Sequence, residues 1–245
     1  MRILIILLLL SVSTVAFAAT GKHIDYSVNG EVFEGYYISP APNAPLVFLV
    51  HDWDGLTGYE VKRAGMLAEL GYAVFCVDMF GKGVRPTEIK DKKKLTGVLY
   101  ADRPRMRILL NGGLKAAKAQ GAHIENGVAM GYCFGGAVVL ELARSGADMK
   151  GFVTFHGGLA IPEGQNYSLT KGKMLVLHGS ADTAVTMEDF ADLAIALERQ
   201  GVNHEMITYS GAPHAFSVFG SPRYREDADR KSWDRFVGFL NDILR

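Results

Sequence analysis

Continuous apolar runs alternate with amphipathic segments along most of this 245-residue chain. The apolar runs predict strands covered on both faces of a sheet, because they show no alternation of polar and apolar residues. These runs cover residues 45–50, 72–80, 124–132, 151–157, 173–179 and 204–211. Segments with helical spacing cover residues 59–70, 103–120, 137–145, 187–200 and 223–245. Such alternation predicts an α/β fold with a mostly parallel, doubly wound sheet and helices on both faces.

The segment before the first buried run has a different pattern. Residues 23–39, HIDYSVNGEVFEGYYIS, alternate polar and apolar side chains around Asn29-Gly30, which predicts an N-terminal antiparallel hairpin. Residues 81–98 are polar and contain glycine and proline, so we expect an excursion from the sheet, with the basic run at 90–94 on a solvated face or loop. No internal repeat or linker interrupts the pattern, which predicts one domain over residues 19–245.

The first 18 residues carry a signal of their own. They combine a positive start at Arg2, an apolar block from Ile3 to Leu10 and the small-residue motif Ala16-Phe17-Ala18. This combination is typical of a secretory signal peptide, residues 1–18. The alternative is an uncleaved membrane anchor, but serine and threonine residues leave the block short of the roughly 20 apolar residues that span a bilayer. We therefore expect an exported protein, periplasmic or secreted, with no membrane attachment after cleavage.

Charge and motif content exclude several partners and cofactors. The chain carries 26 basic and 26 acidic residues, so nothing in its charge favours binding to nucleic acid or to an anionic membrane. It has neither a P-loop motif nor a GxGxxG motif after a strand, which disfavours a nucleotide cofactor. His51, His156 and His178 end strands near one rim, but their spacing matches no metal-binding motif. We expect no metal and no cofactor.

The segment GYCFGG, residues 131–136, joins an apolar run to a helix. A sharp turn between a strand and a helix, flanked by glycines, presents one side chain, and here that side chain is Cys133. The N-terminus of the following helix favours a thiolate and lowers the pKa of a cysteine. The backbone N–H of Phe134 is placed to stabilise an oxyanion. The pattern predicts a cysteine nucleophile.

Two polar residues follow later strands in the order that this chemistry uses. Asp182 lies in HGSADTAV, and His214 lies in GAPHAF. Hydrolases built on this kind of sheet carry nucleophile, acid and histidine in that chain order. His214 would take the thiol proton and return it to the leaving group, while Asp182 would orient the imidazole. We therefore predict a triad of Cys133, Asp182 and His214.

Other interpretations of these residues are open at this stage. GYCFGG is also compatible with a tight turn around a small buried residue, and the whole domain with an inactive hydrolase fold that serves as a binding module. A thiol redox protein would use Cys133 with Cys76, the only other cysteine. Because Cys76 lies inside an apolar run, we expect it to be buried and inert, which disfavours the redox interpretation.

GYCFGG, HGSAD and GAPHAF resemble the dienelactone hydrolase family of α/β-hydrolases, whose nucleophile is a cysteine. The resemblance extends from about residue 22 to the end of the chain. It implies an α/β-hydrolase fold with a sheet of about eight strands. By the same resemblance, Cys133 is the nucleophile, Asp182 the acid and His214 the base.

The resemblance also implies roles for residues outside the triad. The family often has HExxG after its first buried strand, and the corresponding HDWDG places Asp52 where an acidic residue helps to convert the thiol to a thiolate. Trp53 would supply the second N–H of the oxyanion hole. The family binds the carboxylate of its substrate with two arginines. Lys82 is the nearest match to one of them, and Val218 occupies the position of the other.

Together these observations predict a cofactor-free hydrolase of small-molecule carboxylic esters or lactones that acts through a thioester acyl-enzyme. The replacement of both arginines disfavours a dienelactone substrate, because lysine lacks the bidentate fork of arginine and valine carries no charge.

Overall fold

The computed structural model describes residues 19–245, so the predicted signal peptide, residues 1–18, lies outside the described residues. One eight-stranded sheet runs through this part of the chain in the order β1-β2-β4-β3-β5-β6-β7-β8. The strands are β1 (Lys22–Val28), β2 (Glu31–Ile38), β3 (Pro45–Val50), β4 (Ala73–Val77), β5 (His123–Tyr132), β6 (Gly151–Phe155), β7 (Lys173–Gly179) and β8 (His204–Tyr209). The helices are α1 (Gly58–Glu69), α2 (Ile89–Ala101), α3 (Arg103–Ala119), α4 (Phe134–Arg144), α5 (Met187–Arg199) and α6 (Glu226–Leu244).

The pairing of the strands confirms the predicted mixed architecture. β1 pairs antiparallel with β2, and β2 pairs antiparallel with β4, while every later pair is parallel. The hairpin turn uses Asn29 and Gly30 at φ values of 50° and 83°. Two central residues with positive φ are what the favoured two-residue hairpin turn requires, which explains the Asn-Gly pair.

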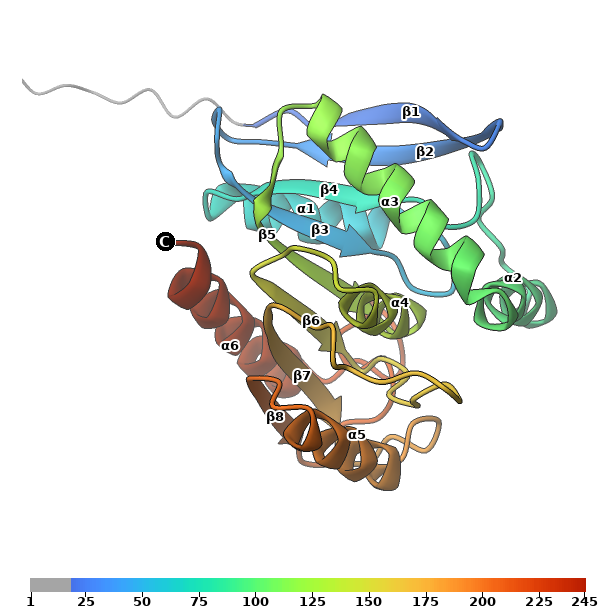
Figure 1. Ribbon diagram of the computed structural model, residues 1–245, viewed down its shortest axis with the longest axis vertical. Coiled ribbons are helices and arrows are strands. Elements are labelled where there is room, and N and C mark those ends of the chain that lie inside the picture. The colour runs from blue at the N-terminus through green and yellow to red at the C-terminus, as the bar shows by residue number, and fades with distance from the viewer. Residues whose placement is uncertain (1–18) are drawn as a thin grey trace, which may run out of the picture.

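Helices cover both faces of the sheet, and each face has its own core (Figure 1). Alternate residues of β3 divide between the two, because side chains along a strand point to opposite faces. Phe48 and Val50 join the core under α3, α4 and α5, whereas Val47 and Leu49 join the core under α1 and α6. Burial on both faces explains why the central strands are continuously apolar in sequence.

The polar excursion contains a helix that the sequence pattern did not indicate. Residues 89–101 form α2, with Thr96 and Leu99 buried and the basic run 90–94 mostly exposed to solvent. The basic run therefore lies on a solvated helix face, one of the two placements expected. The apolar face of α2 is too narrow to show in the sequence, because Thr96 and Leu99 are its only buried residues.

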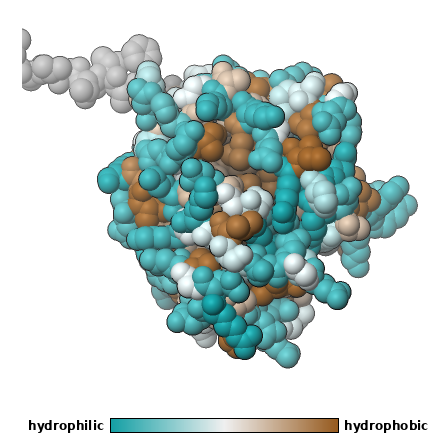
Figure 2. Space-filling model, in the orientation of Figure 1, coloured by the Kyte–Doolittle hydropathy of each residue, from teal (hydrophilic) through white to brown (hydrophobic). Residues whose placement is uncertain are grey.

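The surface carries no large apolar region on the face shown in Figure 2, where hydrophobic residues form small groups among hydrophilic ones. Scattered apolar residues of this kind are normal for a folded domain. Within residues 19–245, no helix has both the length and the apolar character needed to cross a membrane.

Candidate active site

The turn between β5 and α4 holds Cys133 in an unusual backbone conformation. Its φ and ψ are 51° and −112°, a combination that costs a non-glycine residue of order 1–3 kcal/mol. A side chain at Gly131 would clash with the backbone of Gly135, and a side chain at Gly135 would clash with the carbonyl oxygens of Val50 and His51. Glycine is therefore required on both sides of Cys133 because strand and helix approach too closely for a Cβ atom.

The three residues predicted as a triad come together at the carboxyl ends of β5, β7 and β8. His214 Nε2 lies 3.0 Å from Cys133 Sγ, and His214 Nδ1 lies 2.7 Å from Asp182 Oδ2. Asp182 Oδ1 accepts the backbone N–H groups of Ala184 and Val185 at 2.8 and 2.9 Å. The imidazole is thus held by a carboxylate on one side and contacts the thiol on the other.

The electrostatics of the contacts among Asp182, His214 and Cys133 favour a positive charge on His214. Burial alone would lower the pKa of His214, but the hydrogen bonds to Asp182 and Cys133 outweigh it and raise that pKa to about 10. Burial opposes ionisation of Asp182, yet its hydrogen bonds to His214 and to the backbone hold the pKa of Asp182 below its ordinary value. An ionised Asp182 beside a protonated His214 stabilises a thiolate on Cys133.

Two backbone N–H groups, those of Phe134 and Trp53, were predicted to form the oxyanion hole. Phe134 opens α4 directly after Cys133, and Trp53 follows Asp52 in the loop between β3 and α1. In the described residues 19–245, neither of these N–H groups donates to a protein acceptor. Free N–H groups at a helix N-terminus and a neighbouring loop are suited to holding an oxyanion.

Asp52 lies on the opposite side of Cys133 from Asp182, because β3 and β7 flank β5 and β6 in the sheet. Its side chain is 8% exposed, and Oδ1 accepts the N–H of Asp54 at 2.8 Å. Burial raises the pKa of Asp52 to about 6, against the opposing effect of the Asp54 N–H and the positive charges of Lys92 and His214. Asp52 is therefore a largely buried carboxyl group whose pKa lies above its ordinary value.

The contacts of Lys82 do not support its predicted role in substrate binding. Its Nζ forms an ion pair with Asp25 of β1, and both side chains are about half exposed. β1 is the outer strand of the sheet, four strands from β5, or roughly 19 Å at about 4.8 Å per strand. The ion pair thus directs the ammonium group away from Cys133, so the role of Lys82 stays a prediction without a supporting contact.

The strand-end histidines have structural partners, as their positions suggested. His51 Nε2 accepts the N–H of Met79 at 3.0 Å, and burial lowers the pKa of His51 to about 4. His156 Nε2 lies 2.8 Å from Ser217 Oγ, and His178 Nε2 lies 3.1 Å from the carbonyl oxygen of Val185. Among residues 19–245, no three His, Cys, Asp or Glu side chains are grouped so that they could hold a metal ion.

A network behind the site was not anticipated from the sequence. Arg63 of α1 is buried, forms an ion pair with Asp229 of α6 and donates to the carbonyl oxygen of Ser217 at 2.8 Å. Ser217 belongs to the loop that carries His214. The guanidinium also lies 4.1 Å from the centre of the Phe219 ring. Arg63 therefore ties the His214 loop to two helices through a charge-assisted hydrogen bond.

Glu60 was also missed. It lies in the first turn of α1 and is fully buried, on the same helix face as Ala64, Leu67 and Ala68. A charged residue at a helical spacing otherwise occupied by apolar residues is a signal that the sequence contains. Polar residues in first turns are common at the surface, however, so the spacing alone does not separate a buried carboxyl from a solvated cap.

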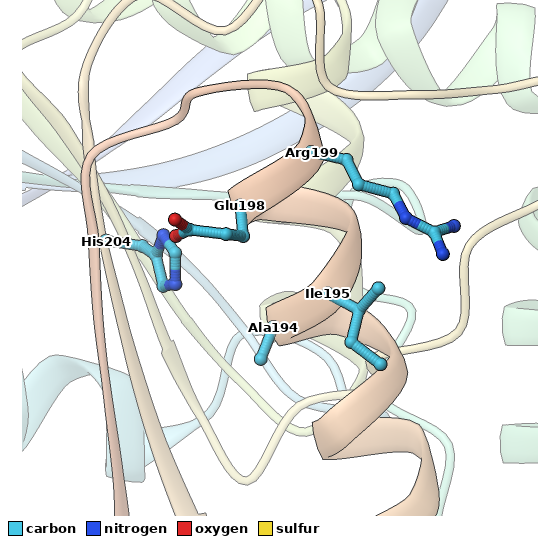
Figure 3. Close-up of a pocket in the computed structure, with 5 residues that line it drawn as sticks. All are labelled: Ala194, Ile195, Glu198, Arg199 and His204. Carbon is cyan, nitrogen blue, oxygen red and sulfur yellow. The ribbon is translucent and has the colours of Figure 1, made fainter.

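Two hollows on the surface lie at different ends of the sheet. A hollow of about 190 Å³ adjoins the first turn of α4 and is lined by Tyr100, Arg103, Ala137, Arg144, Gly158 and Ala160. A larger, more open hollow lies between α5 and the start of β8, where the side chains of Glu198 and His204 point toward each other (Figure 3). The second hollow is at the N-terminal end of β8, away from the strand ends that carry the triad.

Known proteins that are similar to this chain share its fold. The model of the dienelactone hydrolase family matches residues 33–244. A solved structure named "m3DLH" is 28% identical, with a TM-score of 0.87, and the match covers 94% of this chain and all of that one. A dienelactone hydrolase-like promiscuous phosphotriesterase from metagenomic libraries is also 28% identical, with a TM-score of 0.86 over 93% of this chain and 99% of that chain.

A curated relative from Escherichia coli (strain K12), provisionally named carboxymethylenebutenolidase, is 22% identical over 221 residues. That match covers 85% of this chain and 82% of the relative. The region that the family model matches, residues 33–244, runs from within β2 to the end of α6 and includes Cys133, Asp182 and His214. The chain belongs to the dienelactone hydrolase family, and its activity class is that of a hydrolase acting on ester or lactone bonds.

Proposed function

We propose that the protein hydrolyses small-molecule carboxylic esters or lactones through Cys133 and a thioester acyl-enzyme. One observation carries this proposal: His214 lies within hydrogen-bond distance of both Asp182, at 2.7 Å, and Cys133, at 3.0 Å. Nucleophile, base and orienting carboxylate within hydrogen-bond reach of one another are the arrangement that covalent catalysis requires.

In the first half of the proposed reaction, His214 Nε2 takes the proton from Cys133 Sγ, and the thiolate attacks the substrate carbonyl carbon. The N–H groups of Phe134 and Trp53 hold the resulting oxyanion. When the tetrahedral intermediate collapses, the bond to the alcohol oxygen breaks and His214 gives its proton to that oxygen. The products are a thioester on Cys133 and a free alcohol, which in a lactone remains attached to the acyl chain.

In the second half, His214 takes a proton from water, and the hydroxide formed attacks the thioester carbonyl. Collapse of this intermediate breaks the carbon–sulfur bond, releases the carboxylic acid and returns the proton to Cys133. Asp182 holds the imidazole in the required tautomer through both halves. The hollow beside Tyr100 and Ala137, at the first turn of the helix that follows Cys133, offers space for a small acyl or alcohol group.

The test measures hydrolysis of p-nitrophenyl acetate and a panel of lactones by the wild type and Cys133→Ala. We expect activity in the wild type and its loss in the variant. Cys76→Ala is the matched control, because it removes the buried thiol of β4, and it should keep the activity. Mass spectrometry of an acid-quenched reaction should find an acetyl group on the peptide that contains Cys133.

The competing interpretations predict different results. A binding module would show no hydrolysis in the wild type. Hydrolysis that survives in Cys133→Ala would contradict the triad. A redox protein would show no free thiol in the folded state, whereas both cysteines are free in the structure.

We also propose that the protein is exported, on the signal-peptide pattern of residues 1–18. N-terminal sequencing of protein recovered from cells that express the full chain should begin at Ala19, and fractionation should find it outside the cytoplasm. An intact N-terminus in the membrane fraction would contradict the proposal and favour the anchor.

A further inference from the structure

Ser217 is a fully buried polar residue in the loop that carries His214. Its carbonyl oxygen accepts hydrogen bonds from Arg63 at 2.8 Å and from the hydroxyl group of Tyr59 at 3.2 Å. Its hydroxyl oxygen lies 2.8 Å from His156 Nε2 and 3.1 Å from the hydroxyl oxygen of Tyr59. Side chains from α1 and from the end of β6 therefore meet at Ser217.

The ring of His156 connects Ser217 to His214. It packs edge-on against the His214 ring, with 5.5 Å between the ring centres, and edge-on against Phe216 at 5.2 Å. His156 is fully buried, and among residues 19–245 Ser217 is the hydrogen-bond partner of Nε2, while Nδ1 has no partner. The hydroxyl group of Ser217 therefore orients the ring that packs against His214.

Two residues beside His214 have backbone conformations that are uncommon for residues other than glycine. His156 has a φ of 40°, and Ala215, which directly follows His214, has a φ of 62°. Such conformations cost free energy and persist only where the surrounding structure holds them. The place of His214 therefore depends on contacts outside the triad, and those of Ser217 are the polar contacts of its loop with α1 and β6.

The same group of side chains borders the turn that carries the nucleophile. Tyr132 directly precedes Cys133, and its ring lies 5.0 Å from the ring of Tyr59 and 5.9 Å from that of His156, measured between ring centres. The N–H of Cys133 donates to the carbonyl oxygen of Phe155, the residue before His156, at 3.1 Å. The contacts around Ser217 therefore extend from the His214 loop to the turn at Cys133.

We propose that Ser217 is a positioning residue: together with His156, it holds the imidazole of His214 at the angle that lets its two nitrogens contact Asp182 and Cys133 at the same time. This inference rests on the proposed function. The two contacts measure 2.7 and 3.0 Å, so a rotation of the ring would lengthen at least one of them. Proton transfer needs hydrogen-bond reach, and a small misplacement of a reacting group lowers the rate by a large factor.

The principal test is Ser217→Ala, which removes the hydroxyl group and leaves the carbonyl oxygen that Arg63 holds. We expect kcat and kcat/KM for p-nitrophenyl acetate to fall by the same factor, about 10–100-fold, because His214 acts in the transition states of both half-reactions. An unchanged kcat in this variant would overturn the inference.

Ser232→Ala is the matched control. Ser232 is also fully buried, and its hydroxyl group donates to the carbonyl oxygen of Asp229 in α6 at 2.9 Å. Each variant loses one buried hydroxyl group, so urea denaturation should show similar losses of stability in the two. Only Ser217→Ala should lose activity. An equal fall of kcat in both variants would show a general effect of destabilisation and would contradict a positioning role.

A double-mutant cycle tests whether Ser217 acts through His156. His156→Phe keeps an aromatic ring at the end of β6 and removes the hydrogen bond to Ser217. If the two residues act as one unit, the variant that carries both substitutions should lose no more activity than the more damaging single substitution. Losses in kcat that multiply would show that the two residues act independently, which the inference excludes.

A measurement without turnover separates this inference from the proposed function. In the wild type, the Nδ1–H proton of His214 in its 2.7 Å hydrogen bond to Asp182 should give a ¹H NMR resonance far downfield. This resonance should move upfield or broaden in Ser217→Ala and stay in place in Ser232→Ala. If it does so but the wild type hydrolyses no ester or lactone, the proposed function fails while the positioning role stands. Absence of the resonance from the folded wild type would overturn the inference even if every variant failed to fold.

Discussion

Two aspartates lie on opposite sides of Cys133 and behave in opposite ways. Asp182 follows β7, contacts His214 at 2.7 Å and accepts two backbone N–H groups, and its pKa is lowered. Asp52 follows β3, has no cationic side chain in hydrogen-bond contact among residues 19–245, and its pKa is raised to about 6. Both are largely buried.

The difference teaches that burial by itself does not set the charge of a carboxyl group. A carboxylate that gains an imidazolium and backbone donors stays ionised, whereas one that is buried without an ionic partner in contact keeps its proton to a higher pH. A pair of titratable groups whose environments push their pKa values apart is a common way to divide acid and base roles in one site. Asp182 is suited to holding a positive histidine, and Asp52 keeps its proton to a higher pH than Asp182 does.

The largest expected effect on activity distinguishes Asp182 from Asp52. We expect Asp182→Asn to lower kcat/KM for p-nitrophenyl acetate by about 10³–10⁴-fold, because the histidine loses the carboxylate that sets its tautomer. Asp52→Asn should cost less than about tenfold at pH 5, where the wild-type carboxyl is already neutral. Steady-state kinetics at pH 5 and pH 8 check both values. A greater loss in Asp52→Asn than in Asp182→Asn would reverse the comparison.

A third carboxyl group, Asp229, extends the comparison to stability. Asp229 forms an ion pair with Arg63, which also donates a hydrogen bond to the loop that carries His214. Arg63→Met should lower the free energy of unfolding by about 3–5 kcal/mol, since it leaves a carboxyl group buried and unpaired. Urea denaturation measures the change. The control Arg230→Met breaks only exposed ion pairs on α6 and should cost less than about 1 kcal/mol.

The pH dependence of stability should have opposite signs on the two sides of Cys133. Because the pKa of Asp182 is lowered in the folded protein, Asp182 adds to the free energy of unfolding at pH values above its pKa in the unfolded chain. This contribution is lost as the pH falls. The raised pKa values of Asp52 and Glu60 act the other way, so stability should decrease as the pH rises from about 4 to about 7.

His214 contributes in a separate range. Its folded pKa of about 10 lies above its unfolded value, so its contribution is complete below about pH 6.5 and is lost as the pH rises through 10. Urea denaturation at pH 5 and pH 8 should therefore show that the free energy of unfolding of the wild type decreases by on the order of 5 kcal/mol, and the decrease should be smaller in Glu60→Gln. An equal decrease in both proteins would contradict the raised pKa of Glu60.

The smallest effect is expected at Lys82, whose ammonium group pairs with Asp25 of β1. Lys82→Ala removes an exposed ion pair with Asp25, so the free energy of unfolding should change by less than about 1 kcal/mol. Values of KM for anionic and neutral esters should stay within about twofold of the wild type, because the ammonium group points away from Cys133. A selective rise in KM for anionic esters would show instead that Lys82 reaches the substrate.

Much of the fold follows from local patterns in the chain. Continuous apolar runs with intervening helical segments indicated the parallel sheet, and Asn29-Gly30 marked the hairpin that the structure contains. Helix α2 was missed because its narrow buried face, with Thr96 and Leu99, leaves most of its residues in solvent. The glycines of GYCFGG were interpretable because strand and helix can approach so closely only without side chains.

The sequence by itself determined which residues of the predicted triad lie at strand ends, since their order along the chain and the direction of parallel strands place them on one rim. Only the tertiary structure decided which polar groups are buried together. The separate positions of Asp52 and Glu60 say nothing of their mutual repulsion, and Lys82 shows no preference for Asp25 until the hairpin packs beside β4. The physical reason is that pKa values and ion pairs depend on distance and solvent access, which the chain acquires only when distant segments fold against each other.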